Sequence, residues 1–146
     1  MHHIAIINGP NLNLLGTREV DIYGAESFDS FLPRLKDRFP ALRLTYYQSN
    51  VEGELINHLH SLRGEVHGIT LNAGGYSHTS IALGDAIAAV GIATIEVHIS
   101  NVLAREDFRK HSAIASRCLG SISGFGLESY ALALHAFVAR LAAPSA

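Results

Sequence analysis

The sequence predicts an α/β fold in which a parallel β-sheet lies between two layers of helices. Two observations support this prediction. Short apolar runs typical of buried strands alternate five times with segments whose apolar residues recur at helical spacing. The chain has 146 residues, of which 48% are hydrophobic and 16% charged, as expected for one globular domain. We therefore expect a single domain over residues 1–146.

The predicted strands fall at residues 3–7, 42–46, 68–72, 92–99 and 118–122. Alternating strands and helices give a parallel sheet with right-handed crossovers, because each helix packs back onto the sheet. Five such units fit a flavodoxin-like, three-layer αβα fold with strand order 2-1-3-4-5. Ligands of such sheets bind beyond the carboxyl ends of the strands, beside strand one. The loops that start near Asn8, Asn72 and Ile99 should therefore converge.

Helices are predicted at residues 28–39, 51–62, 81–90 and 128–141, and a short charged helix at 105–112. Ser27 is a candidate cap for the first of these, and Pro33 inside it should bend it or shift its start. The predicted apolar face of the 81–90 helix consists of Ile81, Ala82, Ala86, Ile87 and Val90.

Composition excludes several classes of protein. A net charge of −2 provides no general attraction to nucleic acid or to an anionic membrane. The one cysteine, Cys118, lies in an apolar segment and cannot form an internal disulfide, which fits a reducing compartment. We find no signal-peptide pattern and no apolar run of membrane-spanning length, so a cytoplasmic protein is expected. The nine histidines are scattered without a metal-ligand pattern, and no metal is expected.

The long connection after the first strand, residues 8–24, is predicted to be functional. Loops of this length in compact domains are usually lids, binding loops or disordered segments, and the leucines in this one argue against disorder. A lid at about residues 17–24 would carry Arg18 and Tyr23. A neighbouring guanidinium favours a phenolate over a phenol, so the pair could deliver a base to a closed site. Spacing alone favours the alternative of an exposed Arg and a packed Tyr.

The fourth predicted strand carries polar residues where a buried strand should be apolar. Its period of two places Glu96, His98 and Ser100 on one face. Glu96 could orient His98 and raise its basicity, which leaves His98 to donate or accept a proton. The alternative is an edge strand with a solvated face.

Two further pairs are suggested by helical spacing. Arg105 and Arg109 are four residues apart on the predicted charged helix and share one of its faces. They would contact an anion or a polyol, or they would belong to a solvated charged face. His78 and Asp85 are seven apart, and we expect one helix face to present both. Asp85 would then reach a neighbouring subunit or remain in solvent.

Taken together, these segments resemble the type II 3-dehydroquinases, or 3-dehydroquinate dehydratases. The matching blocks are residues 8–24, 52–54, 71–86, 96–112 and 124–132. The resemblance implies anti-elimination of water from 3-dehydroquinate through an enolate, giving 3-dehydroshikimate. The same reaction serves the shikimate pathway of aromatic amino acid biosynthesis and quinate breakdown, and of these we favour biosynthesis. The resemblance further implies a homododecamer, a tetramer of trimers, without metal or organic cofactor. A receiver-like module on the same fold would need an Asp where this chain has Asn72, and a flavin carrier would need a phosphate loop after strand one.

The resemblance also implies roles for individual residues. Tyr23 is the expected base at C2 and Arg18 the residue that activates it. Asn11 positions a water or the enolate, and His98, oriented by Glu96, is the general acid for the C1 hydroxyl. The residues implied in substrate binding are Asn72, Gly74, Gly75, His78, Asp85 from an adjacent subunit, the backbone N–H groups of Ile99 and Ser100, and Arg109, with Arg105 ordering the loop.

Two positions depart from the family's pattern. Val20 and Ala73 stand where many relatives have proline. Replacing proline removes rigidity from the open and unfolded chain, so lid kinetics are expected to change rather than the chemistry.

Overall fold

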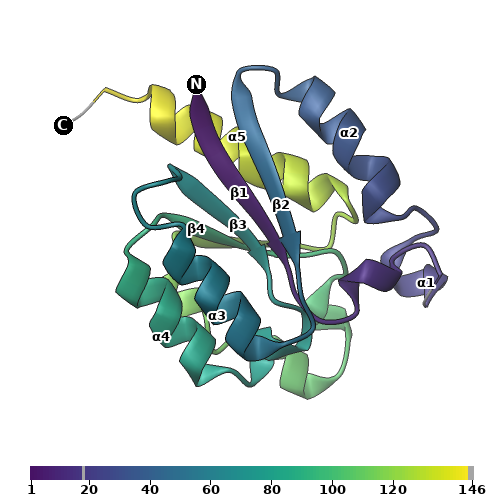
Figure 1. The fold of residues 1–146 in the computed structure, drawn as a ribbon. Helices are drawn as coiled ribbons and strands as arrows, with labels where there is room; N and C mark the ends of the chain where they lie inside the picture. Colours follow the sequence, from purple (N-terminus) through teal and green to yellow (C-terminus); the bar gives the residue numbers. More distant parts are fainter. Residues whose placement is uncertain (18, 145–146) are drawn as a thin grey trace.

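The computed structural model describes residues 1–17 and 19–144, and it has the predicted five-stranded parallel sheet (Figure 1). The strands are β1 (His2–Asn8), β2 (Leu42–Gln48), β3 (Gly68–Asn72), β4 (Thr94–His98) and β5 (Gly120–Ser123). Their order is β2-β1-β3-β4-β5, which confirms the predicted topology. Since β4 pairs with both β3 and β5, it is an interior strand, and the edge-strand alternative is wrong.

Helices cover both faces of the sheet. α2 (Phe28–Arg38) and α5 (Glu128–Ala142) lie on one face, and α3 (Glu52–Ser61) and α4 (Ile81–Val90) lie on the other (Figure 1). The short helix α1 (Val20–Tyr23) belongs to the long loop after β1. The two helical layers leave the carboxyl ends of the strands uncovered, and loops form that end of the molecule (Figure 1).

The alternation of side chains along β1 explains why the core has two halves. Ile4 and Ile6 pack with the aromatic residues of α2 and α5, whereas Ala5 and Ile7 pack with the leucines of α3 and α4. All four are fully or almost fully buried. Burying a side chain such as Ile contributes about 1.5–3 kcal/mol, so both layers are held to the sheet mainly by apolar contacts.

The start of α2 agrees with its sequence signal. The Ser27 hydroxyl accepts a hydrogen bond from the Ser30 N–H at 3.2 Å, and the helix begins at Phe28. Pro33 lies inside α2 without shifting its start, so of the two predicted effects the bend remains a prediction.

The predicted apolar face of α4 was partly wrong. Ile81 is 73% exposed and Ala82 is also exposed, whereas Leu83, Ala86 and Ile87 face the core. The helix is rotated because Gly84 lies against the chain at Ala113, where an added Cβ would be 2.7 Å from the carbonyl oxygen. The glycine permits this close approach, and the approach determines which face points inward.

The predicted helix at 105–112 is not present. Two 3₁₀ turns, η3 (Val102–Ala104) and η4 (Asp107–Lys110), take its place. Arg105 lies between them with extended backbone angles, φ −109° and ψ −158°. The fifth strand also begins later than predicted, because the 3₁₀ turn η5 (Ala115–Arg117) precedes it and leaves Cys118 half-buried outside the strand.

Candidate active site

The loops after β1 and β3 are in direct contact. The Gly9 N–H donates to the Asn72 carbonyl at 2.7 Å. A Cβ at Gly9 would lie 2.5 Å from the Ala73 carbonyl oxygen, so no larger residue fits without moving the backbone. Gly74, with φ +61°, lies against the Pro10 carbonyl on the same side. The predicted convergence of loops is therefore confirmed, and it depends on glycine at the contact.

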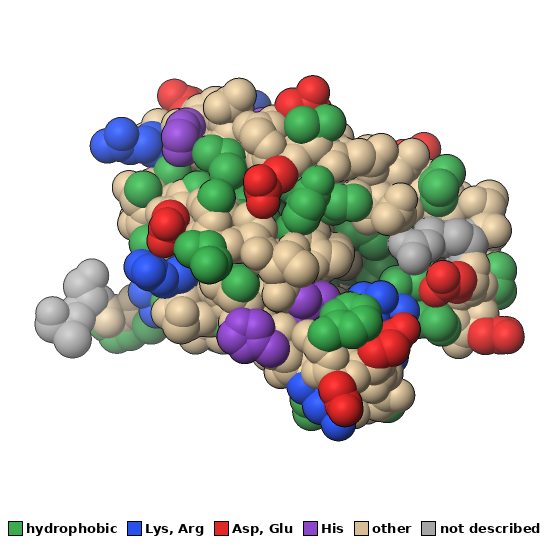
Figure 2. Space-filling view, turned by 90° about the horizontal axis from the view of Figure 1, so that it is seen from below, with side chains coloured by type: hydrophobic (Ala, Val, Ile, Leu, Met, Phe, Trp, Pro, Cys, Tyr) green, Lys and Arg blue, Asp and Glu red, His purple; other side chains and the backbone are tan. Residues whose placement is uncertain are grey.

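These two loops and the loop after β4 enclose a pocket. Figure 2 shows this end of the molecule, with histidine and Lys or Arg side chains beside a recess. Pro10, Leu12 and Val102 contribute an apolar part of the wall that the sequence did not indicate. The predicted residues that line the pocket are Asn11, Tyr23, Asn72, Gly74, Gly75, His78, His98, Ile99, Ser100, Arg105 and Arg109.

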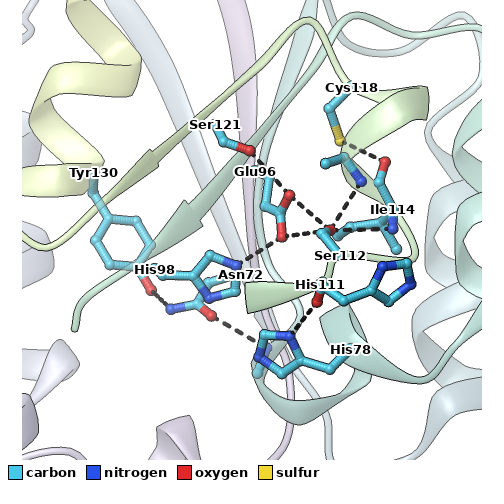
Figure 3. A network of polar contacts seen from close by, with 12 residues as sticks. Asn72, His78, Glu96, His98, His111, Ser112, Ile114, Cys118, Ser121 and Tyr130 are labelled. Atoms are coloured by element: carbon cyan, nitrogen blue, oxygen red, sulfur yellow. Dashed lines mark hydrogen bonds and ion pairs between the residues drawn. The ribbon is translucent and has the colours of Figure 1, made fainter. Parts of the chain in front are cut away.

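Glu96 and His98 form a buried pair behind the pocket, as predicted. The His98 Nε2 lies 2.7 Å from Glu96 Oε2, and Glu96 is 1% exposed. Hydroxyls of Ser112 and Ser121 also donate to the carboxylate, each at 3.0 Å (Figure 3). Burial by itself raises the pKa of Glu96, but the hydrogen bonds from His98 and the two serines outweigh burial and lower it. Glu96 is therefore held as an anion that accepts a hydrogen bond from the Nε2–H, and Nδ1 is the ring nitrogen that Glu96 leaves available.

His78 lies beside His98 with nearly parallel rings, 5.8 Å between centroids and 18° between planes. Its Nδ1 is 2.7 Å from the His111 carbonyl oxygen, to which it donates (Figure 3). Burial lowers the pKa of His78, and the nearby positive charges of His98 and Arg109 lower it further against the opposing carbonyl bond and Glu96. The ring is thus a neutral imidazole whose Nε2 is a hydrogen-bond acceptor.

Asn72 is oriented by a network that the sequence did not predict. Its Nδ2 donates to the Tyr130 hydroxyl at 2.9 Å (Figure 3). That hydroxyl donates to Asn8 Oδ1 at 2.7 Å. Its Oδ1 accepts from the Gly74 N–H at 3.2 Å. Tyr130 is fully buried, and burial raises its pKa, so the hydroxyl stays protonated and can donate. The sequence signals are a phenol among the apolar residues of α5 and its place in the matching block 124–132.

Tyr23 from α1 is in contact with Arg105. The Arg105 Nη1 donates to the Tyr23 hydroxyl at 2.9 Å and to the Ser100 hydroxyl at 3.2 Å. The same guanidinium lies 5.4 Å from the centre of the Tyr23 ring and 3.9 Å from the Glu19 carboxylate. Arg105 thereby connects the loop after β1 to the loop after β4. Arg18, predicted to activate Tyr23, lies outside the described residues.

Arg109 also lines the pocket, although the reason given for it was wrong. Arg105 and Arg109 do not share a helix face, because Arg105 lies outside η4. The Arg109 Nε lies 2.6 Å from a Glu106 oxygen, and its guanidinium lies over the Phe108 ring at 4.8 Å. These contacts hold the guanidinium at the rim of the pocket.

Asp85 does not join the pocket within one chain. It is exposed on α4, and its carboxylate lies 3.6 Å from Arg117 Nη2. His78 belongs to the 3₁₀ turn η2 (Gly74–His78) before α4, so the predicted common helix face for His78 and Asp85 is wrong.

Comparison with known proteins agrees with this geometry. The family model described as "Dehydroquinase class II" matches residues 2–138. The chain belongs to that family. The 3-dehydroquinate dehydratase of Caldicellulosiruptor saccharolyticus is 52% identical over 139 residues, which are 93% of this chain and 96% of the relative. That of an Exiguobacterium species is 53% identical over 136 residues, 92% of this chain and 93% of the relative.

Solved structures of type II dehydroquinases have the same fold as this chain. The crystal structure of a type II dehydroquinase from Butyrivibrio crossotus has a TM-score of 0.91 and 40% identity, and the match covers 94% of this chain and 97% of that one. The enzyme from Propionibacterium acnes has a TM-score of 0.90 and 36% identity, with 95% and 97% covered.

The two departures from the family's pattern lie at the edges of this class II dehydroquinase site. Val20 is the first residue of α1, a position that suits proline. Ala73 has φ −77°, which a proline ring also adopts. Neither departure removes a side chain that lines the pocket.

Within the described ranges 1–17 and 19–144, no group of three or more His, Cys, Asp or Glu side chains is arranged to hold a metal ion. Over the same ranges, no helix is both long and apolar enough to span a membrane.

Proposed function

We propose that this protein is a 3-dehydroquinate dehydratase, a hydro-lyase that removes water from 3-dehydroquinate to give 3-dehydroshikimate in the shikimate pathway. The observation that carries the proposal is one pocket lined by two candidate groups for proton transfer. One is Tyr23, hydrogen-bonded to a guanidinium, and the other is His98, hydrogen-bonded to a buried carboxylate. Family membership and the names of relatives about half identical to this chain support it.

The first step is removal of a proton from C2. The Tyr23 phenolate accepts this proton, and the electron pair moves onto the C3 carbonyl to form an enolate. The Arg105 guanidinium lies on the Tyr23 oxygen and is opposite in charge to the phenolate. The family pattern assigns the activation of Tyr23 to Arg18. Asn11, in the pocket wall, positions a water or donates to the enolate oxygen.

The second step breaks the bond between C1 and its hydroxyl. His98 donates a proton from Nδ1 to the departing hydroxyl, which leaves as water, and the double bond between C1 and C2 forms in conjugation with the restored carbonyl. Glu96 accepts the Nε2–H bond throughout, so it keeps the ring oriented and stabilises the imidazolium before transfer.

The remaining pocket residues hold the substrate. Backbone N–H groups of Ile99 and Ser100 bind the carboxylate, and the Asn72 amide holds the leaving hydroxyl or that carboxylate. His78, as an acceptor, and Arg109, as a donor, contact ring hydroxyls. The Gly74–Gly75 turn lets the backbone approach the ring closely.

We further propose a homododecamer, a tetramer of trimers, in which Asp85 enters the site of an adjacent subunit. The exposed apolar side chains Ile81, Leu103 and Phe125, each more than 60% exposed in the single chain, support burial between subunits. The protein would be a single domain with residues 17–24 as its lid, would need no metal or organic cofactor, and would act in the cytoplasm, where a lone Cys118 stays reduced.

The test is turnover of purified 3-dehydroquinate in chelator-treated buffer, followed by the ultraviolet absorbance of the conjugated enone. We expect turnover without added metal. Absence of turnover by the folded protein would overturn the assignment. Borohydride added with substrate should leave the enzyme active, because the proposed route forms no Schiff base between a lysine and the substrate.

A further inference from the structure

The Glu96 carboxylate receives more hydrogen bonds than its pairing with His98 requires. Oε2 accepts from His98, and the Ser112 hydroxyl lies 3.0 Å from both oxygens. Oε1 accepts in addition from the Ser121 hydroxyl at 3.0 Å (Figure 3). Ser121 is directly opposite Glu96 in the register of β4 and β5, so the ladder itself positions its side chain.

The two serines do not have equivalent surroundings. The Ser112 oxygen also accepts from the N–H groups of Ile114 and Ala115, at 3.2 and 3.0 Å, and so holds the turn before η5. Its single hydrogen is shared between two carboxylate oxygens. Ser121 has an exposed position on the edge strand, and its hydroxyl has Glu96 as its hydrogen-bond partner within the described part of the chain. Ser121 is therefore the residue whose hydroxyl serves Glu96 and not the turn.

We propose that Ser121 is a positioning residue for the acid step: its hydroxyl fixes the Glu96 carboxylate so that Oε2 faces His98 Nε2. This inference rests on the proposed function for its kinetic consequence, but its structural content concerns the free enzyme. A carboxylate can rotate about its last side-chain bond, and His98 on Oε2 with the one shared hydrogen of Ser112 leaves Oε1 without a donor of its own. A donor on Oε1 from a different strand prevents that rotation, because both oxygens are then fixed to backbone elements of the sheet.

The other titratable groups near Glu96 do not replace this contact. His98 is on the same strand and occupies Oε2. The charge of Glu96 raises the pKa of His78, but burial outweighs it and keeps the ring neutral, as described above. The Cys118 thiol bonds to the Ile114 carbonyl, and burial, with the charge of Glu96, raises its pKa to about 12, so it stays a neutral thiol.

The experiment compares Ser121→Ala with Ser121→Thr and Ser123→Ala. Ser121→Thr keeps the hydroxyl and adds a methyl group that suits a strand. Ser123→Ala is the matched control, because Ser123 lies on β5 like Ser121 and is opposite His98 of β4. Its hydroxyl makes no hydrogen bond within the described part of the chain. In the free enzyme, side-chain ¹³C NMR follows the ionisation of Glu96, assigned with Glu96→Gln, and ¹H NMR follows the His98 ring N–H in its bond to the carboxylate.

We expect Ser121→Ala to raise the titration midpoint of Glu96 and to move the His98 N–H resonance upfield, as that bond loosens. In turnover, kcat should fall roughly three- to tenfold with KM little changed, since one hydrogen bond to a charged group is lost and substrate contacts remain. Ser121→Thr should restore both signals and kcat, and Ser123→Ala should match the wild type.

Wild-type values for Ser121→Ala in both NMR signals and kcat would overturn the proposal, and so would an equal effect of Ser123→Ala. Failure of the proposed function has a different signature. The wild-type protein would then not turn over 3-dehydroquinate, while the NMR comparison would still decide whether Ser121 fixes Glu96.

Discussion

In the proposed reaction Tyr23 and His98 perform opposite proton transfers, and their surroundings differ accordingly. Tyr23 is proposed to accept a proton as a phenolate, and a guanidinium lies on its hydroxyl. His98 must hold a proton until the leaving hydroxyl takes it, and a carboxylate lies on its far nitrogen. Each neighbouring group is opposite in charge to its partner in the proposed reaction, the phenolate of Tyr23 and the imidazolium of His98. The proposed chemistry therefore depends on a guanidinium at the Tyr23 hydroxyl and a carboxylate at the Nε2 of His98.

Substituting Tyr23 tests the base directly. Tyr23→Phe keeps the ring and removes the hydroxyl, so we expect kcat to fall about 10²- to 10⁴-fold, the usual contribution of a positioned acid or base. Binding of a substrate analogue, measured by calorimetry, should change far less, because the carboxylate and hydroxyl contacts lie on other residues. Thermal unfolding is the control. Retained turnover would contradict the role of Tyr23 as base. An unfolded variant would instead indicate that Tyr23 has a packing role.

At the scale of elements, the site depends on how closely the loops after β1 and β3 approach. Gly9→Ala would place a methyl group 2.5 Å from the Ala73 carbonyl oxygen, and backbone cannot turn aside as a side chain can. We expect the variant to lose about 1–3 kcal/mol of unfolding free energy and to bind substrate less well, as the loops separate. Urea denaturation and KM measure the two effects.

Gly53→Ala is the matched control for this substitution. Gly53 is exposed inside α3, and a Cβ there would meet nothing within 4 Å. Alanine should therefore stabilise the helix by about 0.5–1 kcal/mol and leave KM unchanged. If Gly9→Ala behaved like Gly53→Ala, the loop contact would have no part in forming the pocket.

The strands and the long helices show what sequence patterns can predict. Short apolar runs indicated the strands and an apolar period near 3.6 indicated the long helices, because burial between layers produces those patterns. Glu96 and His98 were noticed because they are polar residues on a strand that should be apolar. A polar side chain at such a buried position usually has a structural or chemical role. These features are local, and local pattern is what a sequence displays.

Contacts between distant segments were not visible in the same way. Arg105 and Arg109 reach the pocket through two 3₁₀ turns, and no periodic signal distinguishes such turns from one short helix. The rotation of α4 depends on Gly84 meeting Ala113, and Asn72 is oriented by Tyr130, 58 residues away. Each depends on a tertiary approach that is set by the whole fold and not by neighbours in sequence.

For the molecule as a whole, the directions of the pKa shifts predict how stability depends on pH. The pKa values of His58 and His78 are lowered by burial, so the unfolded chain binds protons there that the folded chain does not. Stability is then lost as pH falls from about 6.5, the value for a free histidine, toward the folded values. The lowered pKa of Glu96 has the same sign, with its loss beginning below about 4.3.

Urea denaturation between neutral pH and pH 4 or below measures both windows. Glu96→Gln should flatten the lower one and lose stability at neutral pH, because the amide cannot replace the anion toward His98. Glu106 and Glu128 also have lowered pKa values, Glu106 chiefly from a backbone contact and then Arg109, and Glu128 chiefly from Arg38. Both are exposed, so high salt should reduce their part and leave that of Glu96. Constant stability across the range would contradict the assigned shifts.

The proposed role of Asp85 depends on the assembly of several chains. It lies outside the pocket of its own chain, so its proposed contact with substrate requires a second subunit. Asp85→Ala should therefore lower kcat/KM although its own pocket is intact. Mixing it with Tyr23→Phe during refolding should raise activity above the sum of the separate variants, since about a quarter of the randomly assembled sites would combine Tyr23 of one chain with Asp85 of another. Refolding each variant alone, then mixing, is the control. Activity equal to the sum after joint refolding into oligomers would place Asp85 outside the neighbouring site, and a wild-type kcat/KM for Asp85→Ala would remove it from the reaction.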